Sequence, residues 1–88
     1  MNRVGKIFSL QKKNNRPAFI TYLVCGDPDI TTTLKIMNLM VDSGVDIIEL
    51  GVPFTDPIAD GPVIQKGVER ALKNNISLKS VLKVVESF

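Results

Sequence analysis

The stretch VDIIELGVPFTDPIADGP, residues 45–62, decides the fold because it joins an apolar strand to a loop and then to the start of a helix. Side chains alternate along VDIIELG, so Glu49 and Ile48 belong to opposite faces of the expected strand. Glu49 stands near the C-terminal end of that strand, and Asp60 follows on the loop. An apolar strand rarely carries a charge, so these two carboxylates are the first candidates for a functional site.

A second apolar run, AFITYLVC (residues 18–25), is rich in β-branched and aromatic side chains. Pro17 before it and GDPD after it predict a strand that is buried on both faces. Between the two strands, Asp29 suits a helix N-cap, and apolar residues keep helical spacing as far as Gly44, which suits the residue after a helix. A strand, a helix and a strand of these lengths predict a parallel βαβ unit with a right-handed crossover.

Three more helices are expected. Val4, Ile7 and Phe8 have helical spacing in an opening helix, Pro62 fits the first position of a helix after the loop, and Ser77 can cap the last one. The last helix is expected to bury one apolar stripe, which comprises Leu78, Val81, Leu82, Val85 and Phe88. The alternation of elements predicts an α/β fold. Because two parallel strands cannot cover their own faces, residues 1–88 are expected to be an incomplete single domain without an internal boundary.

The composition is ordinary for a soluble protein, with 44% hydrophobic and 23% charged residues. No apolar run approaches the roughly 18 to 20 residues of a membrane span, and no signal-peptide core is present, so we expect no membrane association and a cytoplasmic location. The single cysteine, Cys25, and the absence of histidine exclude an internal disulfide and the usual zinc sites. Five basic residues precede Asp27, the first acidic one, but their pattern favours a solvated helix face over nucleic-acid binding.

Glu49 and Asp60 have contrasting expected environments. The active sites of parallel α/β folds gather at the C-terminal ends of the strands. There, an apolar surrounding suits Glu49 to general acid/base catalysis, although a structural ion pair would explain it too. The start of a helix stabilises Asp60 as an anion, which leaves two interpretations open: a catalytic carboxylate or a plain helix cap.

The remaining loop residues carry weaker signals. Asp27 and Asp56 each precede a proline, which is typical of turn initiation. The spacing of Asp56 and Asp60 does not require Mg²⁺, so no metal is expected. Phe54 is an apolar residue on a loop, which indicates packing onto the site or burial against a partner. No glycine-rich phosphate-binding motif occurs.

The strings FITYLVCGDPD and GVDIIELGVPFTDPIADGPVIQ, with their separation, resemble the start of the tryptophan synthase alpha chain family. The resemblance implies the N-terminal portion of a (β/α)8 TIM barrel that cleaves indole-3-glycerol phosphate into indole and glyceraldehyde 3-phosphate. It also implies a lyase of tryptophan biosynthesis without a cofactor of its own. Its partner would be a pyridoxal-phosphate-dependent beta chain in an α₂β₂ heterotetramer.

The resemblance also implies roles for individual residues. Glu49 matches the general acid/base, and Asp60 matches the carboxylate that holds the indole nitrogen as positive charge develops there. Tyr22 matches an aromatic residue that packs against the indole ring, with ordinary strand packing as the alternative. Ile64 is expected to line the same pocket. The surface for the beta chain is implied for four loop residues, Pro53, Phe54, Asp56 and Pro57.

Two departures from the family pattern limit these implications. Thr21 stands where a proline is common in the family, which leaves the carboxylates untouched. A complete barrel takes about 250 residues, so this chain supplies about two of eight βα units and lacks the phosphate-binding loops expected after strands seven and eight. We therefore expect no activity from these residues alone. The alternatives are a non-catalytic segment that only binds a partner, or another phosphate-sugar lyase on a TIM barrel.

Overall fold

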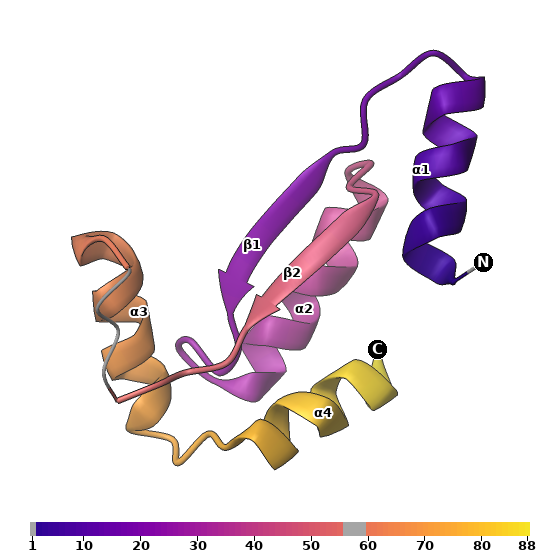
Figure 1. The fold of residues 1–88 in the computed structure, drawn as a ribbon. Helices are drawn as coiled ribbons and strands as arrows, with labels where there is room; N and C mark the ends of the chain where they lie inside the picture. Colours follow the sequence, from indigo (N-terminus) through magenta and orange to yellow (C-terminus); the bar gives the residue numbers. More distant parts are fainter. Residues whose placement is uncertain (1, 56–59) are drawn as a thin grey trace.

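A computed structural model describes residues 2–55 and 60–88 of the chain, and its elements follow the predicted order (Figure 1). The elements are α1 (Arg3–Lys13), β1 (Ile20–Val24), α2 (Ile30–Asp42), β2 (Ile47–Gly51), α3 (Pro62–Leu72) and α4 (Leu78–Ser87). Both strands are shorter than the apolar runs that predicted them. The residues beside them enter turns and loops, as Cys25 does at the end of β1.

The helix ends are set by the residues that the sequence indicated. The Asp29 carboxylate accepts a hydrogen bond from the Thr32 amide at the start of α2. Gly44 follows that helix with φ +96°, a left-handed conformation that glycine adopts without steric cost. Pro62 is the first residue of α3, and Ser77 forms a capping box with Ser80 at the start of α4. The predicted helix starts are confirmed.

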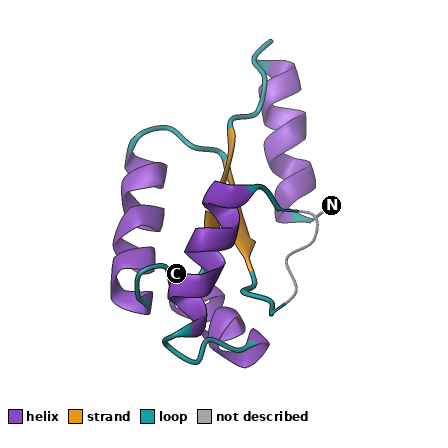
Figure 2. Cartoon of the chain, turned by 90° about the vertical axis from the view of Figure 1, so that its left-hand side faces the viewer, coloured by secondary structure: helices purple, strands orange, loops and turns teal. Residues whose placement is uncertain are grey.

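The two strands are parallel, with Tyr22 paired to Glu49 and Val24 paired to Gly51. Partly buried side chains, among them Leu23, belong to the face that packs against the helices. On the opposite face, Tyr22 and Glu49 are exposed. The prediction that the first strand is buried on both faces is therefore wrong for the residues described, because Ile20 and Tyr22 are exposed. The strands lie among the helices in Figure 2, and α2 and α3 contact β1.

The core lies where the C-terminal end of β1 meets α2, α3 and α4. Its buried apolar residues are Val24, Cys25, Met37, Val68, Ala71, Ile76, Val81 and Val84. Thr33 is fully buried beside them, and its hydroxyl donates to the Asp29 carbonyl and accepts the Gly26 amide at 2.9 Å. This bonding satisfies a polar group that would otherwise be costly to bury. The loop after β1 is thereby fixed to α2.

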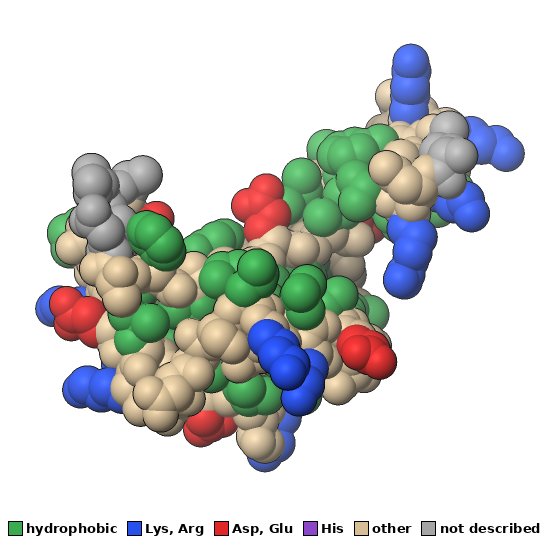
Figure 3. Space-filling model, turned by 60° about the horizontal axis from the view of Figure 1, so that its bottom comes forward, with side chains coloured by type: hydrophobic (Ala, Val, Ile, Leu, Met, Phe, Trp, Pro, Cys, Tyr) green, Lys and Arg blue, Asp and Glu red, His purple; other side chains and the backbone are tan. Residues whose placement is uncertain are grey.

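Helix α1 is joined to the N-terminal ends of the strands through Asp46. The side-chain Nε2 of the buried Gln11 and the backbone amide of Phe19 each donate to the Asp46 carboxylate at 2.8 Å. The bond from Phe19, followed by that from Gln11, holds the pKa of Asp46 below its usual range. The basic residues of α1 are exposed, and Lys and Arg side chains gather at this protruding end (Figure 3). In the described part of the chain, no helix is long and apolar enough to cross a membrane.

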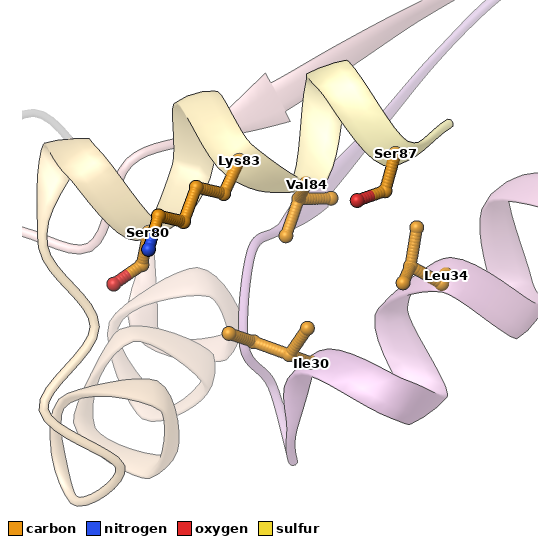
Figure 4. A pocket seen from close by; sticks show the side chains of 6 residues that line it. All are labelled: Ile30, Leu34, Ser80, Lys83, Val84 and Ser87. Carbon is orange, nitrogen blue, oxygen red and sulfur yellow. The ribbon is translucent and has the colours of Figure 1, made fainter.

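Helix α4 is turned differently from the prediction. Val81 and Val84 are buried, whereas Leu78, Leu82 and Val85 of the expected stripe are exposed. The reason is its packing beside α2, where Val84 faces the first turns of that helix (Figure 4). The two helices border an open groove of ≈ 260 Å³ that is lined by Ile30, Leu34, Ser80, Lys83, Val84 and Ser87. This groove belongs to the helical layer and contains neither predicted catalytic carboxylate.

Candidate active site at the C-terminal ends of the strands

Glu49 and Tyr22 are neighbours on the exposed face of the sheet, because they are paired across β1 and β2. Directly paired residues of neighbouring strands project to the same side. Glu49 is exposed, so the apolar surrounding expected for it is not provided by the residues described. Within residues 2–55 and 60–88, the recorded ion pair is Arg70 with Asp27, and Glu49 forms none. The alternative expected for Glu49 is an ion pair with an arginine or lysine from another strand of the barrel, so it stays open.

The Tyr22 side chain lies along the C-terminal end of β2. A methyl group at Gly51 would come 2.1 Å from the Tyr22 hydroxyl oxygen, so the ring occupies the space that this glycine leaves. Partial burial, then the negative charge of Asp60, then that of Glu49 raise the pKa of Tyr22. The charges of both carboxylates thus act on one phenol, and Glu49 is also its partner across the two strands.

Asp60 does not cap α3. The N-cap is Gly61, and no side chain forms a cap hydrogen bond at this helix start. Asp60 contributes its backbone carbonyl, which accepts a hydrogen bond from the side-chain Nε2 of Gln65 at 2.7 Å. The cap interpretation of Asp60 is therefore wrong. The physical reason is that the chain turns into the helix one residue later, at Gly61, ahead of Pro62.

The other predicted site residues are only partly placed. Ile64 is half-buried on α3 and lines a cavity of ≈ 200 Å³ with Leu23 and Val24 of β1. Its role against a substrate stays a prediction. Pro53 is buried, while Phe54 is 65% exposed, as a partner surface would require. The other two proposed interface residues, Asp56 and Pro57, lie outside the described residues.

Tyr22 is the single tyrosine of the chain, so its ionisation can be followed by ultraviolet absorbance. We expect its phenol to ionise above the pH typical of free tyrosine. Asp60→Asn should lower its pKa more than Glu49→Gln does, because Asp60 has the larger effect on the phenol. The titration should be recorded with circular dichroism, which verifies the fold across the pH range. Unchanged titration in both variants would contradict the grouping of the three side chains.

Sequence reasoning missed a set of polar contacts behind this site. The Asp27 carboxylate, expected only to start a turn, receives two hydrogen bonds from Arg70 on α3. Asn74 donates to backbone carbonyls of the same loop. These partners are more than 40 positions apart, and no motif signals a pairing at that separation. The pairing of Asp27 with Arg70 therefore depends on where α3 lies.

Metal-binding chemistry has no site among the described residues. In residues 2–55 and 60–88, no three His, Cys, Asp or Glu side chains form a group that could hold an ion. Cys25 is buried in the core, and burial raises the pKa of its thiol, which disfavours the reactive thiolate.

Parallel strands covered by helices, with carboxylates at their C-terminal ends, define part of an α/β barrel of the kind that carries enzyme active sites. The model of the tryptophan synthase alpha chain family matches residues 8–88, and the chain belongs to that family. This supports the prediction of an N-terminal portion of such a chain.

Individual relatives agree with this assignment. A tryptophan synthase alpha chain of Neisseria gonorrhoeae is 56% identical over all of this chain and 33% of its own length. One of Nitrosomonas europaea is 54% identical, over all of this chain and 32% of its own length. The chain thus spans about a third of the curated relatives it matches.

Solved structures show the same fold. The tryptophan synthase alpha subunit of Legionella pneumophila str. Paris superposes with a TM-score of 0.97 at 43% identity, covering all of this chain and 34% of that chain. A tryptophan synthase from M. tuberculosis in an aminoacrylate-bound form gives a TM-score of 0.91 at 42% identity, covering 98% and 35%. The predicted fold class, a portion of a TIM barrel, is confirmed.

Proposed function

We propose that this chain provides the N-terminal third of a tryptophan synthase alpha subunit and, with it, catalytic residues. Such a subunit is a lyase that cleaves indole-3-glycerol phosphate to indole and glyceraldehyde 3-phosphate. The observation that carries the proposal is the pairing of Glu49 with Tyr22 at the C-terminal ends of the strands, and the negative charge of Asp60 also raises the pKa of Tyr22. The residues belong to a chain of that family. Tryptophan biosynthesis in the cytoplasm follows as the proposed setting.

Glu49 is proposed as the general acid/base. To break the bond between the indole ring and the glycerol side chain, the ring carbon must gain a proton and the side-chain hydroxyl must lose one. A carboxyl group that changes protonation state during turnover can perform such transfers when it lies within hydrogen-bond reach. Glu49 is on the open face of the sheet, where a substrate can approach it.

Asp60 is proposed to remain an anion and to accept a hydrogen bond from the indole nitrogen. Protonation of the ring carbon places positive charge on that nitrogen, and a fixed negative charge stabilises it in the transition state. Asp60 is suited to this task because its carboxylate does not cap α3. Tyr22, the partner of Glu49 across the strands, would pack against the ring.

The chain is proposed to need no cofactor of its own and to bind a beta chain, which carries pyridoxal phosphate, in an α₂β₂ complex. The surface that supports this is the loop after β2, where Phe54 is 65% exposed. Large exposed aromatic side chains are enriched at protein interfaces, where they provide anchors. The buried Pro53 precedes it and restricts the loop backbone.

Phe54→Ser should weaken association with the beta chain by about 10-fold or more, since loss of an anchoring aromatic removes about 1.4 kcal/mol or more of binding free energy. The measured quantity is the dissociation constant for purified beta chain, obtained by titration of the completed alpha chain that the next paragraph describes. Leu39→Ser is the matched control, because Leu39 on α2 is similarly exposed, at 63%, and lies on another element. Equal affinities for the two variants would refute the interface.

The proposed reaction is tested with a hybrid chain. Residues 1–88 of this chain replace the matching third of the Neisseria gonorrhoeae alpha chain, which is 56% identical to them. We expect the hybrid to release indole from indole-3-glycerol phosphate and this chain alone to release none, because a complete barrel takes about 250 residues.

Two alternatives have different outcomes in the same assay. A segment that only binds a partner would give a folded hybrid that associates with the beta chain and releases no indole. Another phosphate-sugar lyase would cleave a different sugar phosphate and leave indole-3-glycerol phosphate intact. Either result would contradict the proposed reaction.

A further inference from the structure

The loop after β1 is bound to α3 by an ion pair of well-defined geometry. Arg70 Nε donates to Asp27 Oδ1 at 2.6 Å, and Arg70 Nη2 donates to Asp27 Oδ2 at 3.0 Å. Two parallel bonds between a guanidinium group and a carboxylate fix orientation as well as distance. The pair therefore sets both the position and the rotation of α3 relative to the loop.

A third side chain extends this contact along the same helix. Asn74, just past α3, donates to the carbonyls of Gly26 and Pro28. At Gly67 a methyl group would lie 2.8 Å from Asp27 Oδ2, so the helix needs a glycine to approach the carboxylate this closely. The loop is thus hydrogen-bonded to Arg70 of α3 and to Asn74 just beyond it, and Gly67 allows the helix to approach closely.

The loop after β1 is also bonded on its other side, to α2. The Gly26 amide donates to the hydroxyl of Thr33, a fully buried residue of α2. Gly26 itself has φ +88°, and a methyl group there would lie 2.4 Å from Ile76 Cγ1. Because the loop is bonded to both α2 and α3, it fixes the position of α3 relative to β1.

We propose that Asp27, Arg70 and Asn74, named here the loop clamp, are positioning residues: by fixing the last turn of α3 to the loop after β1, they set the direction of the whole helix and so the position of Asp60, which precedes its first turn, relative to Tyr22 and Glu49. The effect of the clamp on turnover rests on the proposed function, because it requires Asp60 to be a catalytic residue. The claim that the clamp positions Asp60 does not depend on that function. Asp60 is two residues before Pro62, where α3 begins, and Tyr22 is on β1, whose following loop the clamp binds.

The clamp is suited to positioning more than to stability. The Arg70 side chain is 52% exposed and that of Asp27 is 20% exposed. Solvent-exposed ion pairs contribute little to the free energy of unfolding. Arg70→Met is therefore expected to leave a folded chain in which α3 is less well fixed, so that effects on the site can be measured.

The first test is the ionisation of Tyr22 in the Arg70→Met variant, because it requires no catalysis. Removal of a positive charge by itself would raise the pKa of a phenol. Displacement of Asp60 would lower it, since the Asp60 charge raises the pKa of Tyr22. We expect a lower pKa in Arg70→Met and no further fall when Arg70→Met is added to Asp60→Asn. An unchanged or raised value in the single variant overturns the proposal.

The second test is the turnover of the hybrid chain. Arg70→Met is expected to lower kcat about 10-fold to 100-fold with a smaller change in KM, because small displacements of a catalytic group are costly. Arg70→Lys should recover only part of the loss, since lysine cannot form the two parallel bonds. In an Asp60→Asn background, Arg70→Met should cause no further loss.

Lys66→Met is the control, as it removes another exposed positive charge from α3. An equal loss for Lys66→Met, or a full additional loss in the Asp60→Asn background, overturns the positioning role. An inactive hybrid would refute the proposed function. The pKa of Tyr22 in the Arg70→Met variant would then be the test of whether the loop clamp positions Asp60.

Discussion

Glu49→Gln in the hybrid chain is expected to lower kcat for indole release by about 10²-fold to 10⁴-fold, the usual contribution of a general acid/base. Glutamine keeps the size of the side chain but cannot exchange a proton with the ring carbon or the substrate hydroxyl. The thermal midpoint should change little, because Glu49 is exposed and forms no ion pair within residues 2–55 and 60–88. The measurement is steady-state indole release, with thermal unfolding recorded on the same preparation.

Two further variants distinguish chemistry from charge. Glu86→Gln removes an exposed carboxylate from α4 and should leave turnover unchanged. Glu49→Asp keeps the acid but withdraws it by one methylene, and most activity should be lost because proton transfer needs close approach. Full activity of Glu49→Gln would exclude Glu49 as the acid/base.

The order of the elements was predictable because local signals set it. Apolar runs bounded by Pro17 and by the turn at Gly26 predicted the strands, and Asp29 and Ser77 cap the helices that they were expected to cap. These signals depend on a few neighbouring residues, so they can be recognised from the sequence alone. The choice of Glu49 as a site residue followed from its place at a strand end.

Other features depend on contacts between distant residues. The burial of Val84 instead of Leu82 follows from how α4 lies against α2, which helical spacing alone does not specify. The pairing of Asp27 with Arg70 depends on where α3 lies against the loop after β1. The exposure of Tyr22 depends on which face of the sheet the helices cover. Each of these is a tertiary property, for which local patterns supply no rule.

Asp60→Asn is expected to lower kcat in the hybrid chain by about 10²-fold to 10³-fold, comparable with the loss of a group that stabilises charge in a transition state. Asparagine preserves the shape of the side chain and an acceptor oxygen but removes the negative charge that is proposed to face the indole nitrogen. The thermal midpoint should be nearly unchanged, because the cap of α3 is Gly61 and not Asp60. The readouts are kcat and the thermal midpoint of one preparation.

Asp29→Ala gives the opposite pattern and is the matched control. The Asp29 carboxylate caps α2 through the Thr32 amide, and this bond lowers its pKa. A lowered pKa in the folded chain means that the stabilisation is present above the ordinary carboxyl pKa and is lost as the pH falls through the lowered value. Asp29→Ala should therefore reduce the thermal midpoint at neutral pH, less so in acid, with turnover retained. If Asp60→Asn instead reduced the midpoint and spared turnover, Asp60 would be a structural residue, and the positive charge on the indole nitrogen would need another partner.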